Sequence, residues 1–170
     1  MMELFNVSQH QLHILLYVLL AMLLGAAIGL DREIADKPAG LRTHMLVAGA
    51  ATLFVSLGDI MVQHFDKNLP HGLLRSDPVR IVEAVVTGVS FLGAGTIIRR
   101  RSSNQVEGLT TAASILFAAA VGICVALSQL YLAVGSTVLV LVTLSGVHYL
   151  QGALKIGHKS AVPDKMEDGD

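Results

Sequence analysis

The sequence predicts an all-α membrane protein with five transmembrane helices, and three observations support this fold class. Of the 170 residues, 53% are hydrophobic and only 15% are charged, with a mean hydropathy of +0.64, whereas an ordinary soluble domain has roughly 25% charged residues. Five apolar runs are each near the length of about 20 residues that a helix needs to cross a bilayer core. The charged residues gather between these runs. A net charge of −1 lacks the basic excess of nucleic-acid-binding proteins, so no nucleic-acid partner is expected.

Each span is bounded by polar sequence. The expected spans cover about residues 11–30, 44–64, 79–98, 109–127 and 130–150. The first is retained, because the chain lacks the basic start and small-residue cleavage site of a signal peptide. The third begins at Ser76-Asp77-Pro78, a capping side chain followed by proline at the first turn. Residues 1–154 therefore form one membrane domain, and 155–170 form a polar cytoplasmic tail.

The distribution of Lys and Arg predicts the orientation. Nine of the 12 lie on the side of the membrane that holds the loops at 31–42 and 99–107. The other side holds Lys67, Arg75 and Arg80. Because cytoplasmic loops carry the excess of Lys and Arg, the N-terminus is expected outside and the C-terminus in the cytoplasm.

The chain resembles itself at an offset of 68 residues. Leu24-Gly25-Ala26 recurs as Leu92-Gly93-Ala94, and Gly40-Leu41 recurs as Gly108-Leu109. Arg32 and Thr43 match Arg100 and Thr111. This predicts a parallel internal repeat that relates spans one and two to spans three and four, with the fifth span added. The two cytoplasmic loops then become equivalent.

Small residues recur at helical spacing in the spans, as at Ala21, Gly25 and Gly29 and at Ser114, Ala118 and Gly122. Such stripes let helices approach closely in lipid. They predict tight packing within a bundle or in a homo-oligomer, of which a dimer is favoured.

Carboxylates inside the spans are candidates for an outer site. Asp59 and Glu83 are expected at a similar depth in the outer half of the membrane, where they could form a cation or proton site. Alternatively, Glu83 pairs with Arg80 one turn earlier, Asp59 reaches the interface, and Asp77 caps its helix.

The inner side is richer in polar residues. Spans two and four both begin there, with glycine and threonine at each entrance, and helix N-termini favour anions. Two interpretations stay open. Arg42 and Glu33 form an ion pair that fixes the loop, or the paired loops bind an anionic group, a lipid headgroup or a partner protein.

No motif for catalysis is apparent. His44 and Ser114 match no catalytic pattern, and no phosphate-binding loop occurs. The protein is therefore expected not to be an enzyme and to need no cofactor, with Mg²⁺ a candidate only as ligand or transported ion.

Five segments in order carry a family resemblance. They are G-L-D-R-E (29–33), K-P-A-G-L-R-T-H (37–44), D-P-V-R (77–80), F-L-G-A-G (91–95) and V-E-G-L-T-T-A-A-S (106–114). Together they resemble the MgtC/SapB family of bacterial membrane proteins. The motif positions are Arg32, Glu33, Arg42, Thr43, His44, Asp77, Arg80, Gly93, Gly95, Gly108, Thr110 and Thr111.

The resemblance implies a multi-pass inner-membrane protein with five helices, associated with growth at low magnesium and survival under acid or host stress. Family members are often labelled as magnesium-transport proteins, and one branch is implicated in restraining the membrane ATP synthase, which becomes a candidate partner beside membrane lipid. Several relatives carry a soluble C-terminal domain that this chain, with 20 residues after Leu150, is expected to lack.

Two functions are carried forward. The first is a non-enzymatic membrane regulator of magnesium or ion homeostasis that acts through its cytoplasmic loops. The alternative is a small magnesium, cation or proton transporter that uses Asp59 and Glu83.

Overall fold

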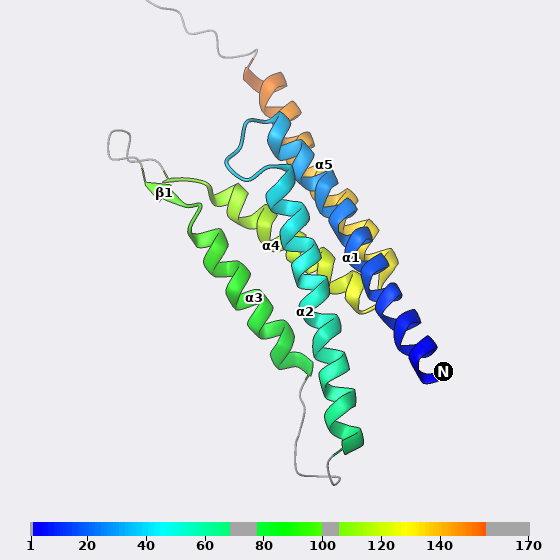
Figure 1. Cartoon of the computed structure of the whole chain (residues 1–170). Coiled ribbons are helices and arrows are strands. Elements are labelled where there is room, and N and C mark those ends of the chain that lie inside the picture. Colours follow the sequence, from blue (N-terminus) through cyan, green and yellow to red (C-terminus); the bar gives the residue numbers. More distant parts are fainter. Residues whose placement is uncertain (1, 69–77, 100–105, 156–170) are drawn as a thin grey trace, which may run out of the picture.

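The chain folds into a bundle of long helices. The computed structural model describes residues 2–68, 78–99 and 106–155. These residues form the helices α1 (Met2–Ile34), α2 (Leu41–Asn68), α3 (Pro78–Ala94), α4 (Leu109–Ala126) and α5 (Leu130–Lys155). Successive helices run in opposite directions (Figure 1). The all-helical fold class is confirmed.

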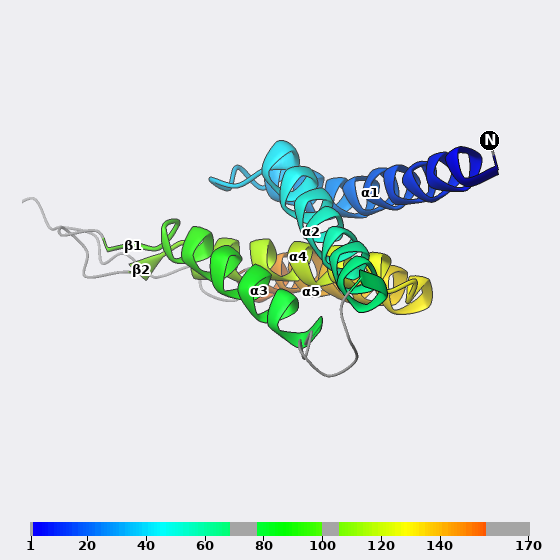
Figure 2. The ribbon, with the colours of Figure 1, turned by 60° about the horizontal axis from the view of Figure 1, so that its bottom comes forward.

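The bundle has an upper end and a lower end in the view of Figure 1. The upper end contains the end of α1, the starts of α2 and α4, and the strands β1 (Ile98–Arg99) and β2 (Val106–Glu107). The lower end contains the start of α3 and the connection between α4 and α5. Figure 2 shows α1 on one side of the bundle and α4 and α5 on the other, with α2 running obliquely from α1 toward α4 and α5. Among the described residues, α4 contacts each of the other four helices.

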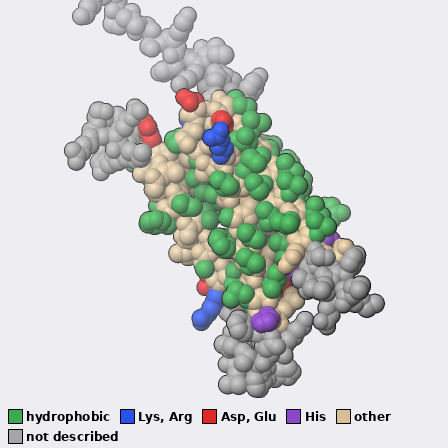
Figure 3. Space-filling model, viewed as in Figure 1, with side chains coloured by type: hydrophobic (Ala, Val, Ile, Leu, Met, Phe, Trp, Pro, Cys, Tyr) green, Lys and Arg blue, Asp and Glu red, His purple; other side chains and the backbone are tan. Residues whose placement is uncertain are grey.

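Length and composition fit a membrane. Within the described residues, three apolar helical segments are long enough to cross a bilayer: Gln9–Ile34, Leu41–His64 and Leu109–Ala126. The 17 residues of α3 and the apolar part of α5, Leu130–Gly146, are shorter. Hydrophobic side chains cover the middle of the face shown in Figure 3, and the coloured charged side chains lie toward its ends. Such a broad apolar surface suits lipid contact rather than water.

Small residues form the packed interior. Ala21, Ala48, Ala118 and Ala119 are fully buried where α1, α2 and α4 meet. Lipid gives little hydrophobic drive for helix association, so this close backbone approach supplies the van der Waals contact.

The third helix ends earlier than the expected span of 79–98. It stops at Ala94, where Thr96 Oγ1 donates to the Gly93 carbonyl at 2.7 Å. The N–H groups of Thr96 and Ile97 donate to the carbonyls of Gly93 and Ala94, which tightens the last turn. The chain then enters an antiparallel hairpin in which Ile98 pairs with Glu107. The sequence analysis did not predict this hairpin.

The connection between α4 and α5 is as tight as expected. Only residues 127–129 separate the helices, and Ser128 has a φ of 59°. Asp77 and the tail from residue 156 onward lie outside the described residues, so their expected roles as helix cap and polar tail stay predictions.

Candidate functional site: a buried polar cluster at the upper end

The loop between α1 and α2 is fixed by a side chain that caps α2. Glu33 Oε2 accepts a hydrogen bond from the Leu41 N–H at 2.8 Å, which satisfies one of the unpaired donors at the start of α2. A Cβ on Gly40 would lie 2.6 Å from the same carboxylate oxygen, so glycine leaves room for this bond. Arg42 is exposed and forms no ion pair with Glu33. The expected ion pair between Glu33 and Arg42 is therefore wrong.

A histidine joins the first turn of α2 to the second turn of α4. His44 is fully buried. Its Nδ1 lies 2.9 Å from the Gly40 carbonyl oxygen, and its Nε2 lies 3.0 Å from Ser114 Oγ on α4. Ser114 Oγ in turn donates to the Thr111 carbonyl at 2.9 Å. The sequence analysis found no motif in His44 and Ser114, yet the structure brings the two side chains together.

These three contacts depend on the proton count of the imidazole. A neutral histidine carries one N–H, and Nδ1 must carry it because the Gly40 carbonyl can only accept. Nε2 then accepts the single hydroxyl proton of Ser114, which leaves the Thr111 carbonyl without this donor. With a second proton on His44, Nε2 donates to Ser114 and all three contacts form together. The hydrogen-bond pattern of the cluster thus changes with the charge on His44.

A buried arginine lies in the last turn of α1. Arg32 is 5% exposed and within electrostatic reach of His44. Its Nε has no hydrogen-bond partner and lies 3.7 Å from Asp31 Oδ2. Asp31 Oδ1 accepts a hydrogen bond from Ser145 Oγ on α5 at 2.6 Å, so this pair also connects α1 to α5. A buried donor left without an acceptor is uncommon in native structures.

Two glycines of the predicted motif, Gly93 and Gly108, lie where the end of α3 meets the start of α4. Gly93 is buried against Ala112, whose carbonyl oxygen would lie 3.4 Å from an added Cβ. Gly108 precedes α4 with a φ of 93°, and an added Cβ would collide with the Thr96 carbonyl. Gly108 thus permits a close backbone contact, whereas Gly93 leaves room for a Cβ at an ordinary contact distance. Thr111 is buried within the cluster, whereas Thr43, Gly95 and Thr110 are exposed.

Asp59 and Glu83, the two candidates for an outer site, do not line the same cavity at the lower end. Asp59 lines a cavity of about 570 Å³ together with His10, His13 and Tyr17, and its Oδ2 accepts a hydrogen bond from Gln63 Nε2 at 2.8 Å. Glu83 is exposed and is absent from this lining. The expected site built from Asp59 and Glu83 together is therefore not supported.

Two further expectations concern this end. Arg80 and Glu83 are both exposed. The described part of the chain contains no ion pair between them, so the alternative expectation of that pair is wrong. The described residues also hold no group of three or more His, Cys, Asp or Glu side chains that could bind a metal ion.

The sequence analysis missed the residues that complete both ends. Ser114 is the last residue of the segment V-E-G-L-T-T-A-A-S, and a polar residue so near the start of an apolar helix was the available signal. At the lower end, Tyr17 stacks on His13 with ring centroids 6.0 Å apart, and its hydroxyl lies 3.3 Å from Ser128 Oγ. No sequence spacing relates these residues to Asp59.

Comparison with known proteins assigns the chain to a family. The model of the MgtC family matches residues 18–153. This range includes the polar cluster at the upper end, which consists of Arg32, His44, Thr111 and Ser114. The chain belongs to the MgtC family. It is 32% identical over 157 residues to Protein SapB of Bacillus subtilis (strain 168), covering 92% of this chain and 63% of SapB.

Other members of the MgtC family show similar identity. The chain is 37% identical over 138 residues to YhiD of Escherichia coli (strain K12), named as a candidate magnesium transporter, covering 78% of this chain and 60% of YhiD. It is 37% identical over 127 residues to Protein MgtC of Salmonella typhimurium (strain LT2), covering 75% of this chain and 49% of that protein. The chain thus spans about half to three fifths of these relatives. No solved structure matches it.

Proposed function

We propose that this MgtC family protein is a non-enzymatic membrane protein that regulates magnesium or ion homeostasis. It acts through the two loops at its upper end, one between α1 and α2 and the other between α3 and α4. The link to magnesium rests on membership of the MgtC family and on the name given to its relative YhiD. The observation that carries the role of the loops is the hydrogen bond between His44 Nε2 and Ser114 Oγ at 3.0 Å. Because this bond joins the first turn of α2 to the second turn of α4, a change at one loop is transmitted to the other.

The cluster can respond to two chemical signals. A proton on His44 changes which hydrogen bonds Ser114 makes. Opening of the loop would expose Arg32, whose buried Nε has no hydrogen-bond partner, to an anionic group on a partner, near helix N-termini that favour negative charge. Charge-assisted hydrogen bonds of this kind are roughly twice as strong as neutral ones. Either event would alter the contacts among α1, α2 and α4.

The burial of the cluster supports a role other than catalysis. Ser114 is 2% exposed and His44 is fully buried, so a substrate has no open path to the hydroxyl. The His44 Nδ1 faces a backbone carbonyl rather than the carboxylate that orients the histidine in a Ser-His-Asp triad.

The proposed topology has five crossings of the bacterial inner membrane, with the N-terminus outside and the C-terminus in the cytoplasm. The alternating helix directions in Figure 1 support it, as do Arg32, Lys37, Arg42 and Arg99 at the upper end. We expect a reporter fused after Asp170 to remain cytoplasmic, and an exported reporter would contradict this orientation.

Two corresponding helix crossings support the internal repeat. On α1, an added Cβ at Gly25 would lie 2.5 Å from the His44 carbonyl oxygen on α2. On α3, an added Cβ at Gly93 would lie 3.4 Å from the Ala112 carbonyl oxygen on α4. Each residue of the second contact is 68 positions after its counterpart in the first. The repeat thus predicts that a glycine faces the backbone of the next helix at equivalent positions in both hairpins, and the approach is closer at Gly25 than at Gly93.

Complementation tests the regulatory function. A strain that lacks the gene and grows poorly at low magnesium receives the wild-type protein, His44→Gln, Ser114→Ala or the exposed control Thr110→Ala. We expect the two cluster variants to fail and the control to restore growth, with equal amounts of each protein in the membrane. Wild-type growth with both cluster variants would refute the role of the cluster.

We also propose that the protein forms homo-oligomers and contacts the ATP synthase. Crosslinking in the same strains tests both proposals.

A second candidate function is cation or proton transport through the lower end. The observation that favours it is the cavity that Asp59 lines together with His10 and His13. In liposomes, we expect a transporter to lose magnesium or proton flux with Asp59→Asn and to keep it with Glu83→Gln, because Glu83 does not line the cavity. Absence of flux with the folded wild-type protein would leave the regulator as the better proposal.

A further inference from the structure

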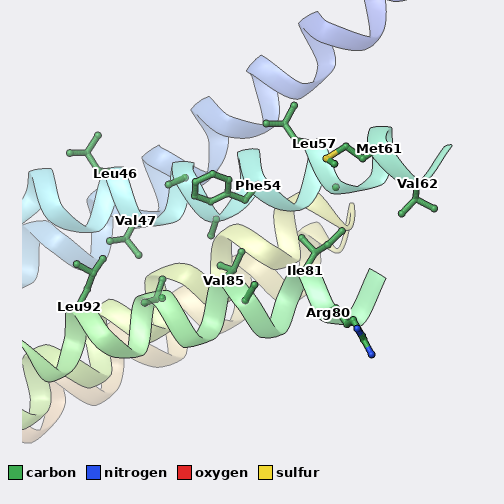
Figure 4. A pocket seen from close by; sticks show the side chains of 16 residues that line it. Leu46, Val47, Phe54, Leu57, Met61, Val62, Arg80, Ile81, Val85 and Leu92 are labelled. Atoms are coloured by element: carbon green, nitrogen blue, oxygen red, sulfur yellow. The ribbon is translucent and has the colours of Figure 1, made fainter. Parts of the chain in front are cut away.

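The helices α2 and α3 touch at one end and separate toward the other. At the lower end, Ile81 of α3 packs against Gly58 of α2 so closely that an added Cβ at Gly58 would collide with its side chain. Farther up, α3 turns to α4, where Gly93 packs on Ala112. This divergence leaves a groove of about 1140 Å³ between α2 and α3 (Figure 4).

The lining of this α2–α3 groove is almost entirely apolar. It includes Leu46, Val47 and Phe54 from α2 and Val85 and Leu92 from α3. Phe54 and Leu92 are 58% and 56% exposed, so large apolar side chains stay uncovered along the groove. On its α3 side, an added Cβ at Gly88 would meet no atom within 4 Å. The groove is therefore open enough to receive an apolar chain.

The groove is long enough to hold an acyl chain. At 1.5 Å per residue, its lining extends for about 18 Å on α3, from Arg80 to Leu92, and for about 24 Å on α2, from Leu46 to Val62. One leaflet of the hydrocarbon core is about 15 Å thick, half of the full 30 Å, so an acyl chain of one leaflet fits within the groove. The choice of a lipid over another helix rests on the charge at one mouth of the groove.

A cation lies at the lower mouth of the groove. Arg80 is exposed, and no carboxylate among the described residues forms an ion pair with it. Its side chain extends outward from the end of the groove, away from the apolar lining (Figure 4). Guanidinium groups bind phosphate oxygens with two parallel hydrogen bonds, so the charge at this mouth complements a phosphate headgroup.

We propose that the α2–α3 groove binds a phospholipid with a net negative headgroup, with an acyl chain along the groove and the phosphate at Arg80. An anionic lipid is preferred over a zwitterionic one, because its headgroup has no ammonium group to compete with Arg80. This site is separate from the upper-end cluster, and its test does not depend on the regulatory function.

The test is lipid titration of the purified full chain in detergent. Native mass spectrometry counts bound phosphatidylglycerol or phosphatidylcholine with the same acyl chains. The variant Gly88→Leu fills the groove, and Arg80→Gln removes the guanidinium. The control Gly135→Leu adds the same side chain to α5 at another position where an added Cβ meets no atom within 4 Å.

We expect Gly88→Leu to weaken phosphatidylglycerol binding about tenfold, equivalent to about 1.4 kcal/mol, and Gly135→Leu to leave it unchanged. Arg80→Gln should abolish the preference for phosphatidylglycerol over phosphatidylcholine. The proposal is overturned if Gly88→Leu and Gly135→Leu behave alike, or if Arg80→Gln keeps the preference. It is also overturned if glycerol phosphate displaces the lipid, which would indicate a site for phosphate alone. A dimer that Gly88→Leu converts to a monomer without loss of lipid would assign the groove to a second copy of the chain.

Discussion

Replacing Gly25 by alanine tests the close approach of α1 to the α2 backbone at His44. The added Cβ would lie 2.5 Å from the His44 carbonyl oxygen and 2.9 Å from the Ala48 Cβ. Cβ atoms essentially never approach another heavy atom closer than 3.0 Å. Since the nearest atom belongs to the backbone of α2, a side-chain rotation cannot relieve the overlap. The two helices must move apart by about 0.5 Å at the turn that holds His44, in an interior that tolerates little added volume.

Gly93→Ala is the matched control, because it adds the same Cβ to a helical glycine without the overlap. Overpacking a dense interior costs about 1–3 kcal/mol, whereas alanine in place of a helical glycine gains up to about 1 kcal/mol. At Gly93 the nearest atom would be 3.4 Å from the added Cβ, an ordinary contact distance. The propensity gain largely cancels between the two variants, so Gly25→Ala should be less stable than Gly93→Ala by about 1–3 kcal/mol.

The assay is the free energy of unfolding, obtained by adding sodium dodecyl sulfate to the protein folded in a mild detergent. Gly135→Ala serves as a second control, because an added Cβ there meets no atom within 4 Å. Gly25→Ala should unfold first, and both controls should equal or exceed the wild-type protein. Equal stability of Gly25→Ala and Gly93→Ala would refute the close crossing of α1 and α2.

Three further changes test the interior with the same unfolding assay. Ser114→Ala leaves the buried His44 without its partner and should cost about 1–3 kcal/mol; no loss would mean that water or another group replaces the hydroxyl. Thr52→Val removes the hydroxyl whose single proton lies between two acceptors, the carbonyls of Gly122 at 2.8 Å and Ala48 at 3.0 Å from Thr52 Oγ1. It should cost about 0.6 kcal/mol, and no more than about 1.7 kcal/mol, so a larger loss would point to repacking. Gly108→Ala should cost at least about 1–2 kcal/mol because of its positive φ, and unchanged stability would contradict that backbone conformation.

The positions of the helices were predictable from hydropathy, but most of their ends were not. The expected span of 109–127 differs from α4 by a single residue at its end, whereas α1, α2 and α5 extend beyond the expected spans of 11–30, 44–64 and 130–150. The third span failed at its end, where apolar Ile97 and Ile98 continue the hydrophobic run after the helix has stopped at Ala94. The stop depends on the Thr96 hydroxyl and on pairing with Val106 and Glu107. Hydropathy does not contain this information, because an apolar residue counts equally in a helix and in a strand.

The members of the polar cluster were predictable in part, but their connection was not. Arg32, His44 and Thr111 were identified from loop motifs, each within its own half of the chain. The bond that joins the halves links His44 to Ser114, 70 residues away, whereas the repeat relates His44 to Ala112. The connection is therefore not a property of either hairpin or of their equivalence. It arises only from the way in which α2 crosses α4.

The central place of α4 has a consequence for the synthesis of the chain. While the ribosome is still producing α3, α1 and α2 are already complete, but Ser114 and the Gly122 carbonyl do not yet exist. During that interval the imidazole of His44 and the hydroxyl of Thr52 lack the partners they have in the finished protein, and polar groups in lipid are costly without partners. A chain truncated before α4 should therefore be a preferred substrate for membrane proteases. Arrival of α4 would end this exposure at both positions at once.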